Sequence, residues 1–383
     1  MRLDAFTERV MRKNKNNKSK LPLTISAQYG LVDQITFFNK VIASTDMSNY
    51  YLLKKGEFAY NKSYSSDYPW GAIKRLDNYE RGALSSLYIC FAPQDNVVSD
   101  FILQYFESPK WHKGVSEIAV EGARNHGLLN VSVQDFFHTY HYVPKDKKEQ
   151  IKIAKLLMLL DERIATQSKI IDKLQSLIKG LNDTLYAQHG VEVVTSFAEL
   201  GTSYSGLSGK SAQDFGSGKP FITYLNVYSN NVINENDFQY VAIKDGEKQN
   251  IVEYGDVLFT LSSETPNEVG IGSVYLGKEK VYLNSFCFGI HITNTKVAFS
   301  PYLSYYVSST AFRKFIYPYA QGSTRFNLCK VDFEKASIKL PTLGHQKRIY
   351  SILSHIDCKM ETEIQMLNLY NSQKQYLLRQ MFI

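Results

Sequence analysis

The sequence predicts an α+β fold in which two related globular domains alternate with two long helices that pair as an antiparallel coiled coil. The second half of the chain repeats the first at an offset of about 200 residues, and each half closes with a proline-led helix that has a heptad pattern. We therefore expect globular domains at 1–143 and 191–340 and helical segments at 144–190 and 341–383, related by an approximate two-fold axis.

The evidence for an internal repeat is the order and spacing of matched segments, because few residues are identical between the two halves. The clearest match places a turn glycine, an acidic residue and an apolar strand at Gly56 and again at Gly255. The other matches are 84–89 with 283–288, 103–108 with 303–308, and Gly122 with Gly322. Nearly constant spacing across a whole half-chain indicates duplication rather than chance.

Both globular blocks alternate short β-patterned runs with glycine, asparagine and serine turns. The expected strands include those at Tyr60, Ile73, 87–91, 221–227, 256–261 and 272–276. Each block also has a shorter helical pattern, near 98–113 and near 300–316. These patterns predict two compact α+β domains.

Apolar residues in the two long helices recur with alternating spacings of four and three, which is typical of a coiled-coil seam. Pro144 and Pro341 mark where the helical segments begin. The predicted seam is Ile153, Leu157, Leu160, Ile164, Gln167, Ile171, Leu174, Ile178, Leu181 and Leu185 in the first helix, and Ile349, Leu353, Ile356, Met360, Glu363, Leu367, Tyr370, Lys374, Leu377 and Met381 in the second. Gln167 and Glu363 hold matching central positions, where a polar pair would fix the register. About 40 residues give each helix a length of ~60 Å. The alternative is two amphipathic helices packed on separate cores.

The composition excludes several classes of protein. The chain is 44% hydrophobic and 21% charged with a net charge of +7, which is ordinary for a folded protein and compatible with nucleic-acid binding. Its four cysteines are dispersed, which favours a reducing cytosol over a disulfide framework or a zinc ribbon. No apolar run reaches the ~20 residues needed to span a membrane, so we expect a cytoplasmic protein without membrane contact.

Two related globules held apart by a rigid spacer suggest a protein that reads two short DNA sequences separated by a fixed gap. This arrangement resembles the specificity subunit of type I restriction–modification systems, over essentially the whole chain. The resemblance depends on Pro144 with 149–154, Leu157, Leu160, Asp161 and Ile164; on Pro341 with 345–346 and 356–357; and on Leu200, Gly201, Gly206, Lys210, Gly218 and 220–222. Two departures are His345, where the family usually carries glutamate, and an entry to the first globule that is about eight residues shorter.

The resemblance implies that each globule is a target recognition domain for one half of an asymmetric bipartite site in double-stranded DNA. The helix pair would set the gap and dock two adenine methyltransferase subunits, which restriction and translocase subunits would join. S-adenosylmethionine, ATP and Mg²⁺ would bind to those partners, and this chain would bind no cofactor. The alternatives are a related system whose partner fuses methylation with cleavage, and a two-headed adaptor or lectin-like protein.

Motifs for catalysis are incomplete in this sequence. The phosphate-loop-like segment 206–211 has Tyr204 where the pattern needs glycine, and no Asp/Asn-Pro-Pro-aromatic loop of adenine methyltransferases occurs. The acid-x-Lys triplets at 146–148 and 357–359 fall at a helix entry and within a helix. His138 and His141 are spaced like metal ligands but lack a third ligand nearby, so we interpret them as structural. We expect no catalytic residue and no metal site.

Candidate DNA contacts are basic, amide and aromatic residues in the predicted loops. Phosphate contacts position a protein on DNA, whereas arginine reads guanine and asparagine reads adenine in the major groove. The candidates are Lys13, Lys15, Lys62, Ser63, Tyr64, Lys74, Arg75, Arg124, Asn125, His126, Tyr204, Lys210, Ser262, Ser263, Arg325, Phe326 and Asn327. Lys13 and Lys15 lie in an asparagine-rich stretch that either is a flexible loop or contacts phosphate.

Overall fold

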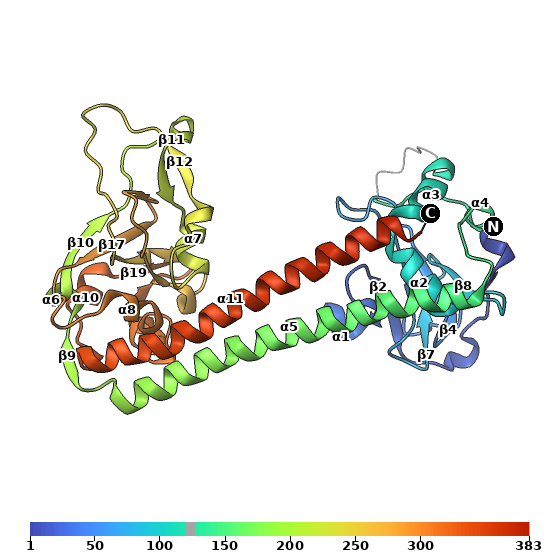
Figure 1. Cartoon of the computed structure of the whole chain (residues 1–383), viewed down its shortest axis with the longest axis horizontal. Helices are drawn as coiled ribbons and strands as arrows, with labels where there is room; N and C mark the ends of the chain where they lie inside the picture. The colour runs from blue at the N-terminus through green and yellow to red at the C-terminus, as the bar shows by residue number, and fades with distance from the viewer. Residues whose placement is uncertain (120–126, 383) are drawn as a thin grey trace. The chain divides into compact units, whose positions relative to one another are not determined.

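The computed structural model describes residues 1–119 and 127–382, which form two compact units. Unit 1 comprises Met1–Ser168 and Gln365–Ile383, and unit 2 comprises Lys169–Ile364 (Figure 1). Two long helices, α5 (Lys147–His189) and α11 (Leu343–Gln380), are divided between the units, so that one part of each helix belongs to unit 1 and the other part to unit 2. Each unit therefore combines a globule with one segment of each helix.

Unit 1 contains two four-stranded sheets, in the orders β1-β8-β5-β6 and β3-β2-β7-β4. Its strands are β1 (Thr7–Arg9), β2 (Pro22–Ser26), β3 (Gly30–Asp33), β4 (Tyr51–Lys54), β5 (Phe58–Asn61), β6 (Ala72–Arg75), β7 (Arg81–Leu84) and β8 (Ile89–Pro93). Its short helices are η1 (Leu3–Ala5), η2 (Lys15–Asn17), α1 (Gln34–Phe38), α2 (Ser99–Glu107), η3 (Pro109–Trp111), α3 (His112–Ile118) and α4 (Val133–His138).

Side chains that alternate along β5 divide the interior of unit 1 into two cores. Phe58 and Tyr60 face the helices, and Tyr60 stacks on Phe136 of α4 with ring centroids 4.8 Å apart. Ala59, between them, faces the second sheet and packs among aliphatic residues such as Leu23. The small residue on the sheet–sheet side lets the two sheets approach closely, while the aromatic side anchors the helices.

Unit 2 repeats this organisation, with sheet orders β10-β17-β13-β15, β12-β11-β16, β14-β19-β18 and β20-β9. Its strands are β9 (Val193–Thr195), β10 (Gly201–Ser205), β11 (Phe215–Ile222), β12 (Gln239–Val241), β13 (Val257–Thr260), β14 (Ser262–Ser263), β15 (Gly272–Val274), β16 (Tyr282–Leu283), β17 (Cys287–Ile292), β18 (Ala320–Gln321), β19 (Phe326–Leu328) and β20 (Ile338–Leu340). Its short helices are α6 (Phe197–Leu200), η4 (Ala212–Asp214), α7 (Tyr224–Ser229), η5 (Glu235–Asp237), η6 (Pro266–Glu268), α8 (Ser300–Tyr306), α9 (Thr310–Ile316), η7 (Tyr317–Tyr319) and α10 (Lys330–Lys335).

The duplication predicted from the sequence is present in the pairing of the strands. Equivalent pairs in the two units differ by 199 residues in both partners: Phe58 with Phe91 and Val257 with Ile290 in the central antiparallel pairs, and Leu23 with Leu84 and Ile222 with Leu283 in the parallel pairs. The matched turn glycines Gly56 and Gly255 have φ of +85° and +91°, which side chains with a Cβ rarely adopt. The two units therefore share the register in which their strands pair, as well as the order of their elements along the sequence.

Within each unit the segments of α5 and α11 run antiparallel, as the seam predicts. In unit 1, Arg163 lies over the ring of Tyr370 and Asp161 pairs with Lys374 farther along α11. In unit 2, Ile178 and Leu181 of α5 share a core with Ile349 and Leu353 of α11, near the end of one helix and the start of the other. All the predicted seam residues are buried or half-buried.

A buried glutamine near the start of each long helix fastens that helix to its globule. Gln150 donates from Nε2 to the carbonyl of Pro144 (2.7 Å) and accepts at Oε1 from the backbone N–H of Val98 (2.7 Å), just before α2. Gln346 makes the same contacts with Pro341 (2.8 Å) and with Phe299 (2.8 Å), just before α8. A second repeated bond joins Gln104 of α2 to Asp161 and Tyr305 of α8 to Asp357. These bonds fix how each globule is held on its own helix segments.

Three predicted elements are wrong in detail. The strand expected at 221–227 ends at Ile222, because the hydroxyl of Thr223 accepts from the backbone N–H of Asn226 and caps helix α7. The helices expected near 98–113 and 300–316 are both interrupted: the first region contains α2, η3 and the start of α3, and the second contains α8 and α9. Ser108 and Ser309 act as N-caps within them and start a new helical turn.

His141 is a structural residue, which confirms the interpretation from the sequence. It is 2% exposed, with Nδ1 3.1 Å from the hydroxyl of Tyr105 and Nε2 2.7 Å from that of Thr139. Both ring nitrogens are thus occupied by hydroxyl groups. Burial lowers the pKa of His141 to about 3.

The buried His141 predicts acid sensitivity of unit 1. Because its pKa in the folded state lies below that of the unfolded chain, the unfolded chain takes up the proton first. The stabilisation is complete above about pH 6.5 and is lost as the pH falls towards 3. We expect His141→Gln to remove about 2 kcal/mol of the stability difference between pH 7.5 and pH 5. Both tryptophans, Trp70 and Trp111, lie in unit 1, so urea unfolding followed by tryptophan fluorescence reports on this unit.

His355→Gln is the matched control, because this histidine is exposed on α11. Its stability should change with pH as the wild type does. Equal pH slopes for wild type and His141→Gln would show that His141 does not carry the effect.

Candidate nucleic-acid interface

Two short strands bring the predicted loop residues of unit 2 together. In the β14–β19 pair, Ser262 lies opposite Asn327 and Ser263 opposite Phe326. Arg325 and Asn327 are exposed, and the guanidinium of Arg325 lies 6.0 Å from the ring centroid of Phe286. Phe286 is 56% exposed in the turn that precedes β17. We call Arg325, Asn327 and Phe286 the unit 2 loop surface.

Unit 1 has the equivalent pairing at the same offset of 199 residues. Ser63 forms an antiparallel bridge with Leu128, and Tyr64 donates from its backbone N–H to the carbonyl of Gly127 (3.0 Å). Ser63 and Tyr64 are exposed, and Lys62 is half-buried with Nζ 3.5 Å from the carbonyl of Val131. Leu87, at the position equivalent to Phe286, is 72% exposed. We call Lys62, Ser63, Tyr64 and Leu87 the unit 1 loop surface.

The predicted contacts Arg124, Asn125 and His126 lie outside the described residues. They directly precede Gly127, which pairs with Tyr64.

The prediction that the two serines of β14 contact bases is wrong, because both are buried structural residues. Ser262 and Ser263 are 5% and 8% exposed. The Ser263 hydroxyl donates to Oε2 of Glu268 (3.1 Å), and the carbonyl of Ser262 accepts from the hydroxyl of Tyr224 (2.8 Å). These bonds hold the strand beneath the unit 2 loop surface.

Lys74 and Arg75 are also structural, because both pair with acids on or near α2. Lys74 Nζ lies 2.6 Å from Oε1 of Glu107, and Arg75 Nη1 lies 2.7 Å from Oδ1 of Asp100. Each side chain is only 12% exposed. Their charges are neutralised inside unit 1, where they attach β6 to the helix.

Tyr204 and Lys210 in unit 2 were also predicted to contact DNA. The structure shows instead that both are paired with acidic residues inside the unit. The Tyr204 hydroxyl donates to Oδ2 of Asp256 (2.6 Å), and its ring stacks on His291 with centroids 4.3 Å apart. Burial and the neighbouring carboxylate of Asp256 raise the pKa of Tyr204 far above its usual value. Lys210 is 6% exposed in its side chain and donates to the carbonyl of Ala242 and to Glu247 (2.6 Å each). Neither group is available for a phosphate or a base.

The asparagine-rich stretch of unit 1 is an ordered turn. Asn14 is fully buried, and its side chain donates to the carbonyl of Ser19 (3.0 Å) and accepts from the same residue's N–H (2.8 Å). Lys13 is held over the ring of Tyr51 at 4.3 Å and donates to the carbonyl of Asn49 (2.8 Å). Lys15 is exposed in η2. Of these two lysines, Lys15 is the one whose charge faces solvent.

Sequence reasoning missed several exposed residues near these surfaces. Phe286 and Leu87 were not selected, although the offset of 199 residues relates them and both are exposed at equivalent turns. Lys219 on β11, and Lys244 and Lys248 just after β12, are also exposed in unit 2. The repeat offset could have identified the apolar pair.

None of the helices in the described part of the chain combines the length and the apolar character needed to cross a bilayer.

Part of the chain is similar to a known protein family, and the whole chain is similar in fold to solved structures. Residues 201–369 match the family model of the type I restriction modification DNA specificity domain. A chain from a structure concerned with complex assembly and conformational transition of the type I R-M system matches at a TM-score of 0.59 and 14% identity, covering 99% of this chain and 95% of the other. The type I restriction-modification system S subunit from M. genitalium matches at a TM-score of 0.53 and 13% identity, covering 100% of this chain and 95% of the other. No curated protein matches the sequence.

Proposed function

We propose that this chain is a DNA specificity subunit of the kind found in type I restriction–modification systems, and that each unit reads one half of a bipartite DNA site. The observation that carries the proposal is the repeated loop surface, built twice with an offset of 199 residues on equivalent strand pairs. A duplicated reader with different side chains in its two copies would recognise two different half-sites.

The chemistry of the loop surfaces supports base reading. Arg325 offers two parallel donors for the O6 and N7 atoms of guanine, and Asn327 has the donor and acceptor that match adenine. Phe286 adds an exposed apolar face beside Arg325, suited to a thymine methyl group or a base face. In unit 1, Tyr64 is 51% exposed beside Ser63, and Leu87 holds the position equivalent to Phe286. The two surfaces offer different donors, which suits an asymmetric site.

We further propose that the helix pair sets the gap and docks two adenine methyltransferase subunits, with restriction and translocase subunits joining them in the cytoplasm. Apolar side chains outside the seam support docking. Ile151, Leu156 and Leu159 on α5 are 51%, 47% and 53% exposed, and Leu369 on α11 is 65% exposed. Exposed apolar side chains mark protein interaction sites when they form a contiguous patch, and Leu156 and Leu159 are neighbours on one face of α5. S-adenosylmethionine, ATP and Mg²⁺ would be bound by the partners, and this chain would act without a catalytic group.

The test is co-expression with the adjacent methyltransferase, followed by mapping of methylated adenines. We expect methylation of two unlike half-sites separated by a fixed gap. Arg325→Ala should relax one position of the unit 2 half-site, because loss of a bidentate contact to a base costs about 1–3 kcal/mol of discrimination. The other half-site should keep its sequence.

Arg348→Ala is the matched control, because Arg348 is an exposed arginine on α11, away from the loop surface. It should leave the methylated sequence unchanged. A single contiguous methylated site in the wild type would contradict the bipartite reading. An unchanged motif in Arg325→Ala would remove this arginine from the interface.

A further inference from the structure

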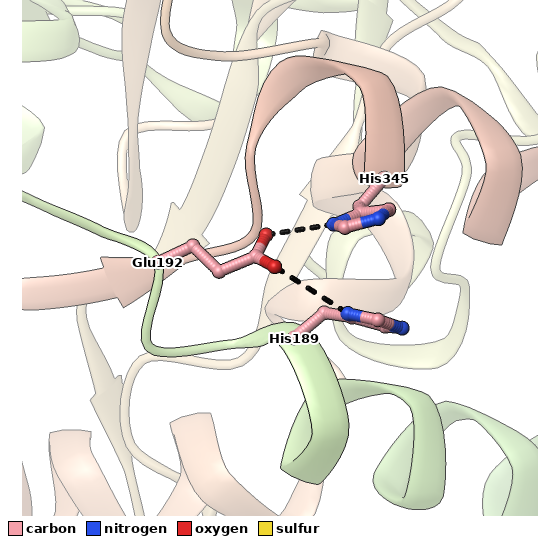
Figure 2. A group of neighbouring side chains, drawn as sticks. All are labelled: His189, Glu192 and His345. Carbon is pink, nitrogen blue, oxygen red and sulfur yellow. Dashed lines mark hydrogen bonds and ion pairs between the residues drawn. The ribbon is translucent and has the colours of Figure 1, made fainter.

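Two histidines and a glutamate meet where α5 ends and α11 begins, within unit 2 (Figure 2). His189 is the last residue of α5, Glu192 precedes β9, and His345 lies in the first turn of α11. His345 Nδ1 lies 2.8 Å from Oε2 of Glu192, and His189 Nδ1 lies 3.4 Å from Oε1 of the same carboxylate. The two imidazole rings lie with their centroids 4.0 Å apart. Both rings therefore present one nitrogen to a shared carboxylate.

The backbone around these side chains fixes their positions. Thr342 donates from its backbone N–H to Oε2 of Glu192 (2.8 Å), and its hydroxyl lies 3.2 Å from Nδ1 of His345. The β9–β20 ribbon holds the two chain segments together, with Val193 opposite Leu340 directly beside this group. The three side chains are 27–38% exposed, so solvent reaches them. The site is thus held by the fold and open on one side.

The internal repeat shows that this group is particular to the second copy. The position equivalent to His345 at the start of α5 is Glu149, just as Gln150 is equivalent to Gln346. A glutamate is the usual favourable residue in a first helical turn, since the N-terminal end of a helix attracts negative charge. Histidine at this place gives up that advantage and acquires Glu192 and His189 as neighbours.

We propose that His189, Glu192 and His345 bind a divalent transition metal ion of the Zn²⁺ class, with water completing the coordination. Imidazole nitrogen and carboxylate oxygen are ligands that zinc prefers, and two histidines with one glutamate form a known three-ligand set. Metal–ligand bonds of 2.0–2.1 Å require tetrahedral ligands to be separated by about 3.3 Å. The observed separations of 2.8 and 3.4 Å are to the two oxygens of Glu192, and the candidate ligand atoms all lie within 4.8 Å of one another, so small side-chain shifts would complete the site.

The hydrogen bonds of Glu192 show how the ligands are directed. Its Oε2 accepts from the backbone N–H of Thr342 and lies 2.8 Å from Nδ1 of His345, so the carboxylate already faces the imidazole. Each imidazole would bind in its neutral form through Nδ1, with its proton moving to Nε2. The ion would then join the end of α5, the segment at Glu192 and the start of α11 in one clamp.

The experiment uses the full chain, purified without an oligohistidine tag and freed of metal by a chelating resin. Co²⁺ is added first, because its visible absorption reports tetrahedral coordination, and Zn²⁺ is then titrated to displace it. We expect saturable binding of one ion per chain. His189→Ala and His345→Ala should each weaken binding about 100-fold or more, and Glu192→Gln about 10-fold or more.

His355→Ala is the matched control, because it removes an exposed histidine of the same helix that lies outside the group. It should bind as the wild type does. Zn²⁺ at 100 times its dissociation constant should also raise the melting temperature of the wild type by about 5 °C or more, and that of His345→Ala by much less.

Absence of saturable Co²⁺ or Zn²⁺ binding by the wild type would overturn the proposal and leave the group as a hydrogen-bonded contact. Binding that persists in His345→Ala, or is lost in His355→Ala, would overturn it as well. Circular dichroism of each variant shows whether it is folded, and the wild-type titration decides the matter if a variant is not. None of these readouts involves DNA, so the result is independent of the proposed half-site recognition.

Discussion

Inserting four residues after Ser168 of α5 together with four after Ile364 of α11 should lengthen the gap in the methylated DNA site by one or two base pairs. Each insertion adds about 6 Å of helix, and DNA rises about 3.4 Å per base pair. The insertions fall at the limits of the two units, so contacts inside each unit are kept. Both helices must be lengthened, because their segments pack antiparallel in each unit. Mapping of methylated adenines measures the gap.

A four-residue insertion between Lys278 and Glu279 is the control, since both are exposed in the turn between β15 and β16. It should leave the gap unchanged. New half-site sequences combined with the original gap would refute the spacer role of the helices.

Replacing Gln150 with leucine should destabilise unit 1 by about 2–3 kcal/mol. Gln150 is 1% exposed, and its loss leaves the N–H of Val98 and the carbonyl of Pro144, both in half-buried residues, without their partner. The variant should shift the urea midpoint of tryptophan fluorescence, which reports on unit 1.

Gln175→Leu on the same helix is the control, because that glutamine is exposed. Gln346→Leu removes the equivalent bonds in unit 2 and should leave the tryptophan transition nearly unchanged while lowering the circular dichroism transition. A midpoint for Gln150→Leu equal to that of Gln175→Leu would show that the glutamine contributes nothing to the attachment.

The long helices and the duplication could be predicted because they depend on patterns within the chain. A heptad records which face of a helix is covered, and all the seam residues from Ile153 to Met381 are buried or half-buried. The repeat of Gly56 at Gly255 records a backbone turn with positive φ, and it correctly aligned the strands that follow. Both patterns can be recognised in the sequence without knowing which distant residues are in contact.

The individual contact residues could not be sorted in the same way, because a charge is free or paired according to residues far away in the sequence. Lys74 is neutralised by Glu107, and Lys210 by Glu247. Tyr204 lies in a strand whose alternate residues face the core, and Asp256 accepts its hydroxyl. The group of His189 with His345 was missed for the same reason, since α11 returns to the end of α5 only in the folded chain.

The composition of unit 1 has a consequence for the order in which the protein is completed during synthesis. Leu378 and Phe382 are 1% and 3% exposed and belong to the same core as Phe58 and Trp111. A ribosome delivers amino-terminal domains first, and these usually fold as they emerge. Here the globule that leaves the ribosome first must wait for residues that are translated after all of unit 2, whereas unit 2 has all its residues beforehand. Synthesis of unit 1 therefore begins before that of unit 2 but is completed after it.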